Sequence, residues 1–173
     1  MNRSEKATLQ LHAVAVLRTL KRTRTYDDLA VKTGLTPNDL NRYVNGHVLP
    51  SAERARELVE GVGHDMVITE LERRIQTDDE GYVDNTDVVF DARLLKLIPP
   101  VAQTKLGLEP PDAVLTAATD GITLATAMAD YFGATVVYAK KTRETAVEEF
   151  IESRQRLESG IEIAYYLPTH ALA

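Results

Sequence analysis

Two helix-start signals separated by a glycine constrain the fold of this chain more than any other feature. Thr25 stands three residues before Asp28, a spacing at which a hydroxyl and a carboxylate can cap a helix reciprocally. Thr36 followed by Pro37 repeats the start signal, because proline suits the first turn of a helix. Gly34, which lies between the two signals, can adopt the left-handed conformation that other residues avoid. The stretch therefore predicts two short helices joined by a tight turn.

The residues of this stretch, 26–45, also predict how the two helices pack. Ala30 is small enough for the helices to approach each other closely. The side chains that we expect to face inward are Leu29, Leu35, Leu40 and Tyr43. The side chains that remain outward on the second helix can bond base edges and phosphates, and they are Thr36, Asn38, Asn41, Arg42 and Asn45.

Further helices are expected on both sides of this pair. Apolar residues recur at helical spacing over residues 5–21, which predicts an amphipathic first helix. Ser51 can cap a fourth helix, which we expect to end near Gly61 and Gly63. Another helical segment is expected over residues 66–75.

With these neighbours, the segment resembles the helix-turn-helix domain of the phage-repressor type over about residues 8–62. The family's glycine and proline after the recognition helix are matched by Gly46 and Pro50. The resemblance implies that the outward set reads the major groove of double-stranded DNA, with Asn45 at its margin, and that the protein is a homodimer on paired half-sites. It assigns contacts to backbone phosphates to Lys21, Arg22, Arg24, Lys32 and His47. The alternatives are a helical hairpin with a solvated polar face and, for His47, an ordinary exposed loop residue.

Charge is divided unevenly along the chain, which has a net charge of −6. Residues 1–58 hold ten Lys or Arg against six Asp or Glu, whereas residues 59–80 hold two against seven and residues 81–173 hold eight against thirteen. Because salt screens charges over short distances, only the basic N-terminal part is expected to meet a polyanion. The alternative is a chance fluctuation of a few charges.

The acidic segment 77–86 is expected to be a linker between a DNA-binding domain, residues 1–76, and a second domain, residues 87–173. The second domain is predicted to be a parallel-sheet α/β fold. A strand at 113–117, a helix at 122–132 and a strand at 135–139 form a βαβ unit with a right-handed crossover. The other expected elements are a helix over 91–106 interrupted at Pro99 and Pro100, a helix carrying Val147, Phe150, Ile151 and Leu157, and a third strand at 161–167.

Small polar residues follow the first of these strands. In open α/β sheets such a loop binds ligands, because free backbone N–H groups and the helix dipole favour an anion. Thr119, Asp120 and Gly121 supply a hydroxyl, a carboxylate and room for a phosphate near the backbone, and the next strand ends in Lys140 and Lys141. The sequence therefore predicts a cation-lined phosphate or pyrophosphate site. The alternative is a βαβ packing unit with a glycine-containing turn and a solvated lysine pair.

This arrangement resembles the type I phosphoribosyltransferases over about residues 86–170. The matching residues are Ala118 to Gly121 in the loop and the Lys140–Lys141 pair. The family's acidic pair before a Thr/Gly-rich phosphoribosyl pyrophosphate loop has no match, because Asp27–Asp28 and Asp78–Asp79 lie elsewhere and the chain ends at Ala173. We therefore expect a Rossmann-like domain that is incomplete at its C-terminus and has no catalytic residues.

Together these features predict a transcriptional regulator whose phosphoribosyltransferase-like domain dimerises and senses a purine nucleotide or phosphoribosyl pyrophosphate. One alternative is a purine or orotate phosphoribosyltransferase with an accessory helix-turn-helix domain and an active site completed beyond residue 173. Another is a C-terminal domain that only pairs subunits or recruits a partner. The chain has no Cys and its four His are scattered, so we expect no metal site and no cofactor. Without a long apolar run or a signal peptide, a soluble cytoplasmic protein is the default expectation.

Overall fold

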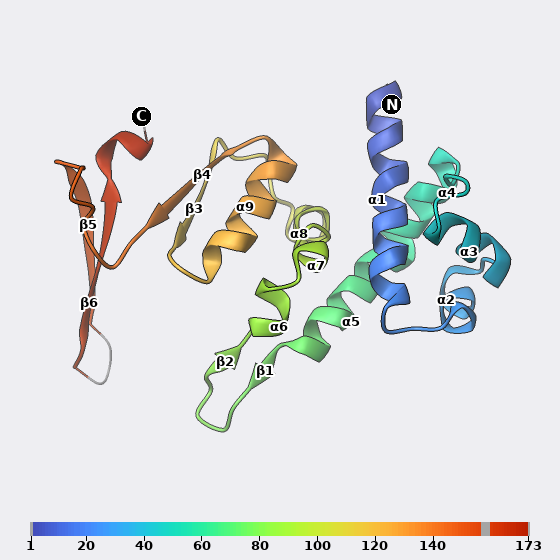
Figure 1. Ribbon diagram of the computed structural model, residues 1–173, viewed down its shortest axis with the longest axis horizontal. Helices are drawn as coiled ribbons and strands as arrows, with labels where there is room; N and C mark the ends of the chain where they lie inside the picture. The colour runs from blue at the N-terminus through green and yellow to red at the C-terminus, as the bar shows by residue number, and fades with distance from the viewer. Residues whose placement is uncertain (1, 157–159, 173) are drawn as a thin grey trace. The chain divides into compact units, whose positions relative to one another are not determined.

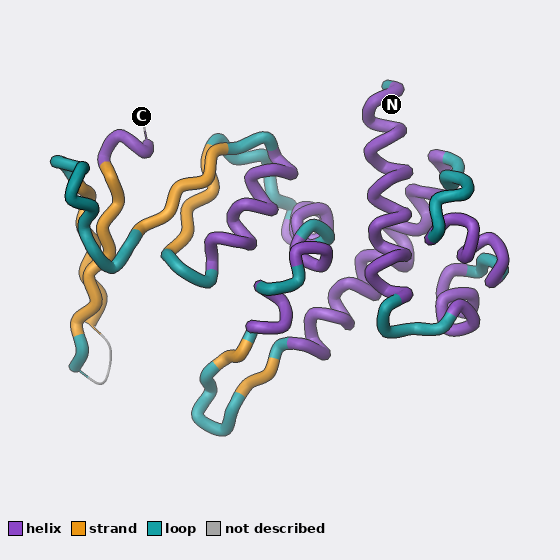
Figure 2. The backbone as a smooth tube through the Cα atoms, viewed as in Figure 1, coloured by secondary structure: helices purple, strands orange, loops and turns teal. Residues whose placement is uncertain are grey.

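A computed structural model describes residues 2–156 and 160–172, and the chain divides into two compact units, Met1–Val101 and Ala102–Ala173 (Figure 1). The fold is mixed, with a helical first unit and strands concentrated in the second (Figure 2). The main helices of the first unit are α1 (Arg3–Lys21), α2 (Tyr26–Thr33), α3 (Pro37–Val44), α4 (Ala52–Arg56) and α5 (His64–Arg74).

Helix α1 is the central helix of the first unit, and its expected range is confirmed. Asn2 caps it, because the Asn2 side chain accepts a hydrogen bond from the backbone N–H of Glu5 while the Glu5 carboxylate accepts one from the backbone N–H of Asn2. The buried face of α1 contacts α3, α4 and α5, so this helix fixes the positions of the others. The apolar side chains buried on that face are Ala13, Val14, Val16, Leu17 and Leu20.

The helix that starts after Ser51 does not end at Gly61 or Gly63, so that prediction is wrong. After α4 the chain continues through a π-helix, η1 (Glu57–Gly63), directly into α5. A Cβ added to Gly63 would lie 2.6 Å from the carbonyl oxygen of Leu58 and 3.3 Å from Cγ1 of Val16. Gly63 therefore leaves room for the Leu58 carbonyl within the π-helix and for Val16 of α1, and it does not end the helix.

Residues 76–101 complete the first unit. The expected linker contains a short antiparallel hairpin of β1 (Gln76–Thr77) and β2 (Val83–Asp84). Three short helices follow, α6 (Thr86–Val89), α7 (Ala92–Leu95) and α8 (Ile98–Leu106), the last of which continues into the second unit. Leu94 and Leu95 of α7 and Leu97 in the turn after it are buried. The division between the units therefore falls at Val101 and Ala102, further along the chain than residues 77–86.

The single helix expected over residues 91–106 is wrong in its boundaries, because α7 and α8 are separate. Pro99 and Pro100 lie in the first turn of α8, where they begin the helix and do not interrupt it. The first turn of a helix has no internal acceptor for its N–H groups, so the missing N–H of proline costs nothing there.

The βαβ unit predicted in the second unit is confirmed. Strands β3 (Ala113–Ala117) and β4 (Thr135–Ala139) pair in parallel from Ala113 opposite Thr135 to Ala117 opposite Ala139. Helix α9 (Gly121–Phe132) connects them and packs against both strands. It ends at Gly133, whose φ of 71° lies in the left-handed region that favours glycine.

A hairpin of two longer strands completes the second unit, as the orange segments near the C-terminus in Figure 2 show. The helix expected around Phe150 and Ile151 is wrong, because these residues lie in β5 (Phe150–Arg156); Leu157, also assigned to that helix, lies outside the described residues. The expected third strand exists as β6 (Glu162–Pro168), but it pairs antiparallel with β5. It also contacts β4, and Tyr166 forms a bridge to Lys140, the residue that follows β4. The 3-10 turn η2 (Thr169–Leu172) follows.

Cross-strand packing explains this error. The rings of Phe150 and Tyr166 meet edge to face with their centroids 6.2 Å apart. Contacts of this kind depend on residues distant in sequence, and they outweigh a weak local preference for helix.

Candidate nucleic-acid interface and candidate phosphate loop

The turn between α2 and α3 is held by the residues that predicted it. The Thr25 hydroxyl accepts a hydrogen bond from the backbone N–H of Asp28 at 3.1 Å, and Asp28 Oδ2 accepts one from the backbone N–H of Thr25 at 2.9 Å. The hydrogen bonds from the Thr25 hydroxyl and backbone lower the pKa of Asp28. Gly34 ends α2 with a φ of 68°, and its N–H donates to the carbonyl of Ala30. The two helices and their tight turn are thus present as expected.

Helix α3 is amphipathic over its whole length. Thr36 caps it by accepting from the backbone N–H of Asp39 at 3.1 Å, while its hydroxyl donates to Asp39 Oδ2 at 2.7 Å. Leu40 is completely buried, whereas Leu35 and Tyr43 are half-buried. Contacts of α3 with α1 and α2 hold this apolar side in place.

All five residues expected to face outward on α3 are exposed, namely Thr36, Asn38, Asn41, Arg42 and Asn45. They are not equally available to a ligand. The Thr36 hydroxyl is engaged in the helix cap, and Asn45 Nδ2 donates to the Asn41 carbonyl at 3.0 Å and to Asn41 Oδ1 at 3.1 Å. Within the described part of the chain, no hydrogen bond or ion pair engages the side chain of Asn38 or Arg42. These two side chains are therefore free to meet a partner.

The C-terminal end of α3 is anchored by a residue that the sequence did not single out. Arg18 Nε donates to the carbonyl oxygen of Val44 at 2.7 Å. A Cβ on Gly46, whose φ is 75°, would lie 3.2 Å from the Arg18 guanidinium. Gln10 similarly donates to the carbonyl of Pro50 at 2.6 Å. Helical spacing marks Arg18 only as polar, because its acceptor lies in a distant part of the chain.

The basic residues assigned to DNA phosphates lie in different surroundings. The Lys21 ammonium is 4.7 Å from the ring centroid of Tyr26. Arg22 forms an ion pair with Asp91 at 3.0 Å, although 49% of its side chain remains exposed. Lys32 and His47 are exposed, whereas Arg24 is half-buried and lines a pocket beside α2.

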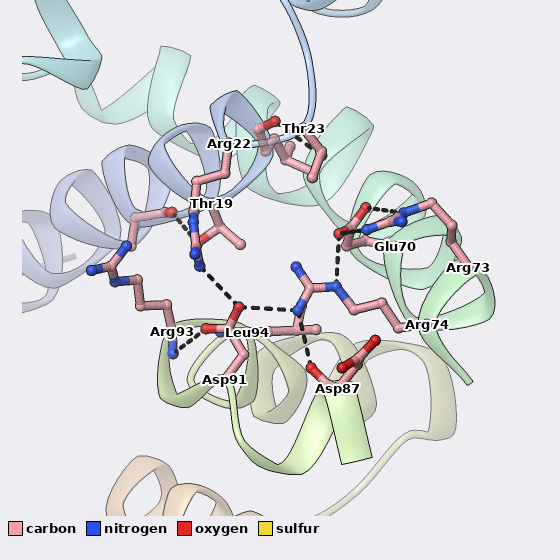
Figure 3. Close-up of polar contacts among 12 residues, drawn as sticks. Thr19, Arg22, Thr23, Glu70, Arg73, Arg74, Asp87, Asp91, Arg93 and Leu94 are labelled. Carbon is pink, nitrogen blue, oxygen red and sulfur yellow. Dashed lines mark hydrogen bonds and ion pairs between the residues drawn. The ribbon is translucent and has the colours of Figure 1, made fainter. Parts of the chain in front are cut away.

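The ion pair of Arg22 belongs to a larger network between α1, α5 and the start of α7 (Figure 3). Glu70 is buried, with 3% of its side chain exposed, and accepts hydrogen bonds from Arg73 at 2.9 Å and Arg74 at 2.8 Å. Arg74 in turn donates to Asp91 at 3.0 Å. This network ties α7 to α1 and α5 and thus explains why residues 86–101 belong to the first unit.

The network also shifts the ionisation of its carboxylates. The hydrogen bond from Arg73 lowers the pKa of Glu70, with help from Arg74 and against the opposing effect of burial. Burial acts to raise the pKa of Asp91, but hydrogen bonds from Arg74 and the backbone N–H groups of Leu94 and Arg93 outweigh it and lower the value. Both groups are therefore charged at neutral pH, and Arg22 is held by a carboxylate that competes with any phosphate.

In the second unit, strand register brings the predicted phosphate loop to the end of β4. The backbone N–H of Ala118 donates to the carbonyl of Ala139 at 2.8 Å. Thr119 and Asp120 are exposed, and the Asp120 side chain forms no capping hydrogen bond to α9. The loop and the residues after β4 thus share one edge of the sheet.

Gly121 has a packing role in this loop. A Cβ at Gly121 would lie 2.0 Å from Oγ1 of Thr116, so any larger residue would force the Thr116 side chain to move where α9 approaches β3. The sequence had assigned this glycine to a phosphate, and the structure supplies a different reason for it.

Lys140 and Lys141 differ in their surroundings. The Lys140 ammonium is paired with the Glu144 carboxylate and lies 5.4 Å from the ring centroid of Tyr138, whereas Lys141 is exposed. A hollow beside Lys140 opens toward the C-terminal hairpin and is lined by Tyr138, Glu144, Phe150 and Tyr166 rather than by the loop. Lys140 would have to leave Glu144, or share it, in order to bind an anion at the loop.

Comparisons with solved structures give a distant likeness. No family model matches the sequence, and no curated protein matches it. A solved structure that is similar to this chain is adenine phosphoribosyltransferase from Rhodothermus marinus, with a TM-score of 0.48 and 17% sequence identity. The likeness covers 60% of this chain and 61% of that one.

Two further features describe the molecule as a whole. Among the described residues, no helix combines the length and the apolar character needed to cross a membrane. The same residues contain no group of three His, Asp or Glu side chains arranged to hold a metal ion.

Proposed function

We propose that this protein is a sequence-specific DNA-binding regulator of transcription that reads double-stranded DNA with α3. The observation that carries this proposal is the division of α3 into a buried side at Leu40 and an exposed polar side. A short helix with such a side fits the major groove, where each base pair presents a distinct pattern of donors and acceptors.

The roles within α3 follow from the side chains that are free. Arg42 is a donor suited to the O6 and N7 acceptors of guanine, and Asn38 is suited to the N6 and N7 pattern of adenine. Asn45 Nδ2 donates to Asn41 Oδ1, so these two side chains would meet the DNA as a pair, with Asn45 at the margin of the groove. Lys21 supplies a contact to a backbone phosphate, whereas Arg22 contributes less because Asp91 holds it.

Selection of binding sites from random DNA tests this function directly. The full chain is expected to enrich a defined sequence, with paired half-sites if the protein binds as a homodimer. Arg42→Ala is expected to lower discrimination at one base position by about 1–3 kcal/mol, whereas Lys21→Ala is expected to weaken binding to all sequences and reduce the dependence on salt.

Lys6→Ala is the matched control, because Lys6 is an exposed cation near the start of α1. It is expected to leave both selectivity and affinity unchanged. Recovery of no preferred sequence, or equal effects of Arg42→Ala and Lys6→Ala, would contradict the proposal.

We further propose that the second unit pairs two copies of the chain and binds a purine nucleotide or phosphoribosyl pyrophosphate. Support comes from the exposed Thr119 and Asp120, which share a sheet edge with Lys140 and Lys141. A purine nucleotide and phosphoribosyl pyrophosphate are expected to raise the melting temperature, and Lys141→Ala is expected to reduce this rise. Lys96→Ala, which removes an exposed lysine elsewhere, serves as its control.

A phosphoribosyltransferase reaction is the rival to this sensing role. Steady consumption of phosphoribosyl pyrophosphate with a nucleobase would favour the rival. Binding without turnover would favour the sensor, and an unchanged melting temperature with every nucleotide would favour a unit that only pairs subunits.

A further inference from the structure

A pocket in the first unit lies beside α2, and none of its lining residues belongs to α3. It is lined by residues of the loop before α2, of α2 itself, of the π-helix η1 and of α5. The residues that matter for its chemistry are Arg24, Lys32, Gly61, Asp65 and Met66. The pocket is thus formed within one unit, at the junction of α2 with the irregular helical segment.

The Arg24 guanidinium gives this pocket an unmet hydrogen-bonding requirement. Its Nε is buried and has no hydrogen-bond partner among the described residues. A buried donor that has lost its water is costly unless an acceptor replaces it, and more so when the donor is charged. Arg24 therefore brings to this pocket a guanidinium whose Nε no described residue satisfies, while its charge also acts on the carboxylate of Asp28.

The second cation, Lys32, makes the missing acceptor an anion. Lys32 is exposed, and no described residue holds its ammonium in an ion pair. Among the lining residues two cations face one carboxylate, that of Asp65, and Asp28, on which the charge of Arg24 also acts, does not line the pocket. A phosphate oxygen is a strong acceptor for both a guanidinium and an ammonium.

We propose that this pocket binds the phosphate group of a small molecule. The lining is both charged and apolar, which favours a phosphate carried by a small molecule over a phosphate of the DNA backbone. Val62 and Met66 give the pocket an apolar wall against which the rest of a small molecule can pack. The sequence had assigned Arg24 and Lys32 to DNA phosphates. They instead form a separate anion site, and its test does not depend on whether α3 reads DNA.

Titration of the full chain with inorganic phosphate at constant ionic strength, followed by amide NMR, tests the proposal. Saturable shifts are expected for residues 61–69 and for the amide of Lys32. Arg24→Gln and Lys32→Gln are each expected to raise the Kd for phosphate by about tenfold, as for the loss of one charge-assisted hydrogen bond. Arg3→Gln and Lys6→Gln, which remove exposed cations of α1, are expected to leave the Kd unchanged.

A third variant fills the pocket without removing a charge. A Cβ added at Gly61 would meet no atom within 4 Å, and Gly61 lines the pocket, so Gly61→Leu is expected to fold and to narrow the pocket. It is expected to weaken phosphate binding and to leave the melting temperature unchanged or higher.

Two results would overturn the proposal. One is the absence of saturable shifts, or shifts that the control variants reduce as much as Arg24→Gln does. The other is an unchanged spectrum with phosphate combined with weaker binding of duplex DNA by Arg24→Gln and Lys32→Gln, which would identify the DNA backbone as the anion.

Discussion

The two units of this protein bury their apolar side chains to very different extents. In the first unit, leucines from α1, α2, α3 and α7 are almost completely inaccessible, as Leu17, Leu29, Leu40 and Leu94 show. In the described part of the second unit, the buried apolar side chains are those of Ala125, Ala129, Val137 and Leu167. We therefore expect the first unit to be the more stable of the two.

The difference follows from how each unit is layered. Helices surround α1 in the first unit, so each of them finds a partner for its apolar side. In the second unit α9 packs against β3 and β4, and the residues of β3 alternate between exposed and half-buried. One face of β3 is thus left open, and Leu115 on that face is 62% exposed.

Truncation of one leucine in each unit gives the largest expected contrast. Leu40→Ala is expected to lower the free energy of unfolding of the first unit by about 2–5 kcal/mol, because it leaves a cavity between α1, α2 and α3. Leu115→Ala is expected to change stability by less than about 0.5 kcal/mol, because its side chain is exposed. Urea unfolding followed by circular dichroism measures both.

If Leu115→Ala lowered the free energy of unfolding as much as Leu40→Ala does, the proposed difference in burial between the two units would be wrong. It would mean that the open face of β3 is covered in solution, and a concentration-dependent stability would then identify a second copy as the cover.

The buried network of the first unit has the next largest expected effect. Glu70→Gln is expected to lower the free energy of unfolding by about 3 kcal/mol, because it leaves Arg74 buried with fewer charged partners. The folded-state pKa of Glu70 lies below its ordinary value of 4.5, so its contribution is complete above about pH 4.5 and is lost as the pH falls below that value. Glu70→Gln should therefore flatten the loss of stability on acidification.

Urea unfolding at a series of pH values measures this effect, with Glu72→Gln as the control for an exposed carboxylate of the same helix. Equal acid sensitivity of the native chain and Glu70→Gln would show that the network does not carry the pH dependence.

The sequence predicted local features of both units and missed the long-range ones. Caps at Thr25 and Thr36 and the turn at Gly34 depend on neighbours three or four residues away, so spacing alone was enough to find them. The exposed side of α3 was also predicted from local sequence, because the helical repeat determines which side chains share a face. The Arg18 contact with Val44 and the network of Glu70 with Arg74 and Asp91 join distant segments, and no local pattern marks them.

The errors have the same origin. Gly63 resembled a helix end because the sequence does not reveal that Val16 of α1 lies against it. Phe150 and Ile151 fitted a helical spacing, but pairing with β6 decides their structure. At the candidate phosphate site the sequence predicted that Thr119 and Lys140 lie at the same edge of the sheet. It did not predict the ion pair between Lys140 and Glu144.

Replacement of one glycine in each unit is expected to cost less stability than the changes above, and for a different reason in each unit. Gly121→Ala is expected to cost about 1–3 kcal/mol, because its methyl group overlaps Oγ1 of Thr116. Gly34→Ala is expected to cost about 1 kcal/mol for a different reason, since its backbone is left-handed and no atom crowds its Cβ position.

Removal of the Thr116 side chain tests whether the cost of Gly121→Ala comes from overlap with that side chain. The double variant Gly121→Ala/Thr116→Ala is expected to be more stable than the sum of its single changes predicts, as unfolding free energies in a double-mutant cycle would show. Strict additivity would mean that the methyl group at position 121 does not act through Thr116.

The smallest expected effect concerns His12 on α1, whose pKa is lowered by burial and, to a lesser extent, by the charge of His64. The folded unit therefore favours the neutral imidazole. Stability is complete above the ordinary pKa of 6.5 and falls as the pH drops below it, because the unfolded chain binds the proton first. The first unit should lose stability between about pH 7 and 5, before its carboxylates begin to titrate. His12→Gln, followed by urea unfolding across this interval, should remove that slope and leave the more acidic Glu70 transition intact, whereas an unchanged slope would assign the pH dependence to other groups.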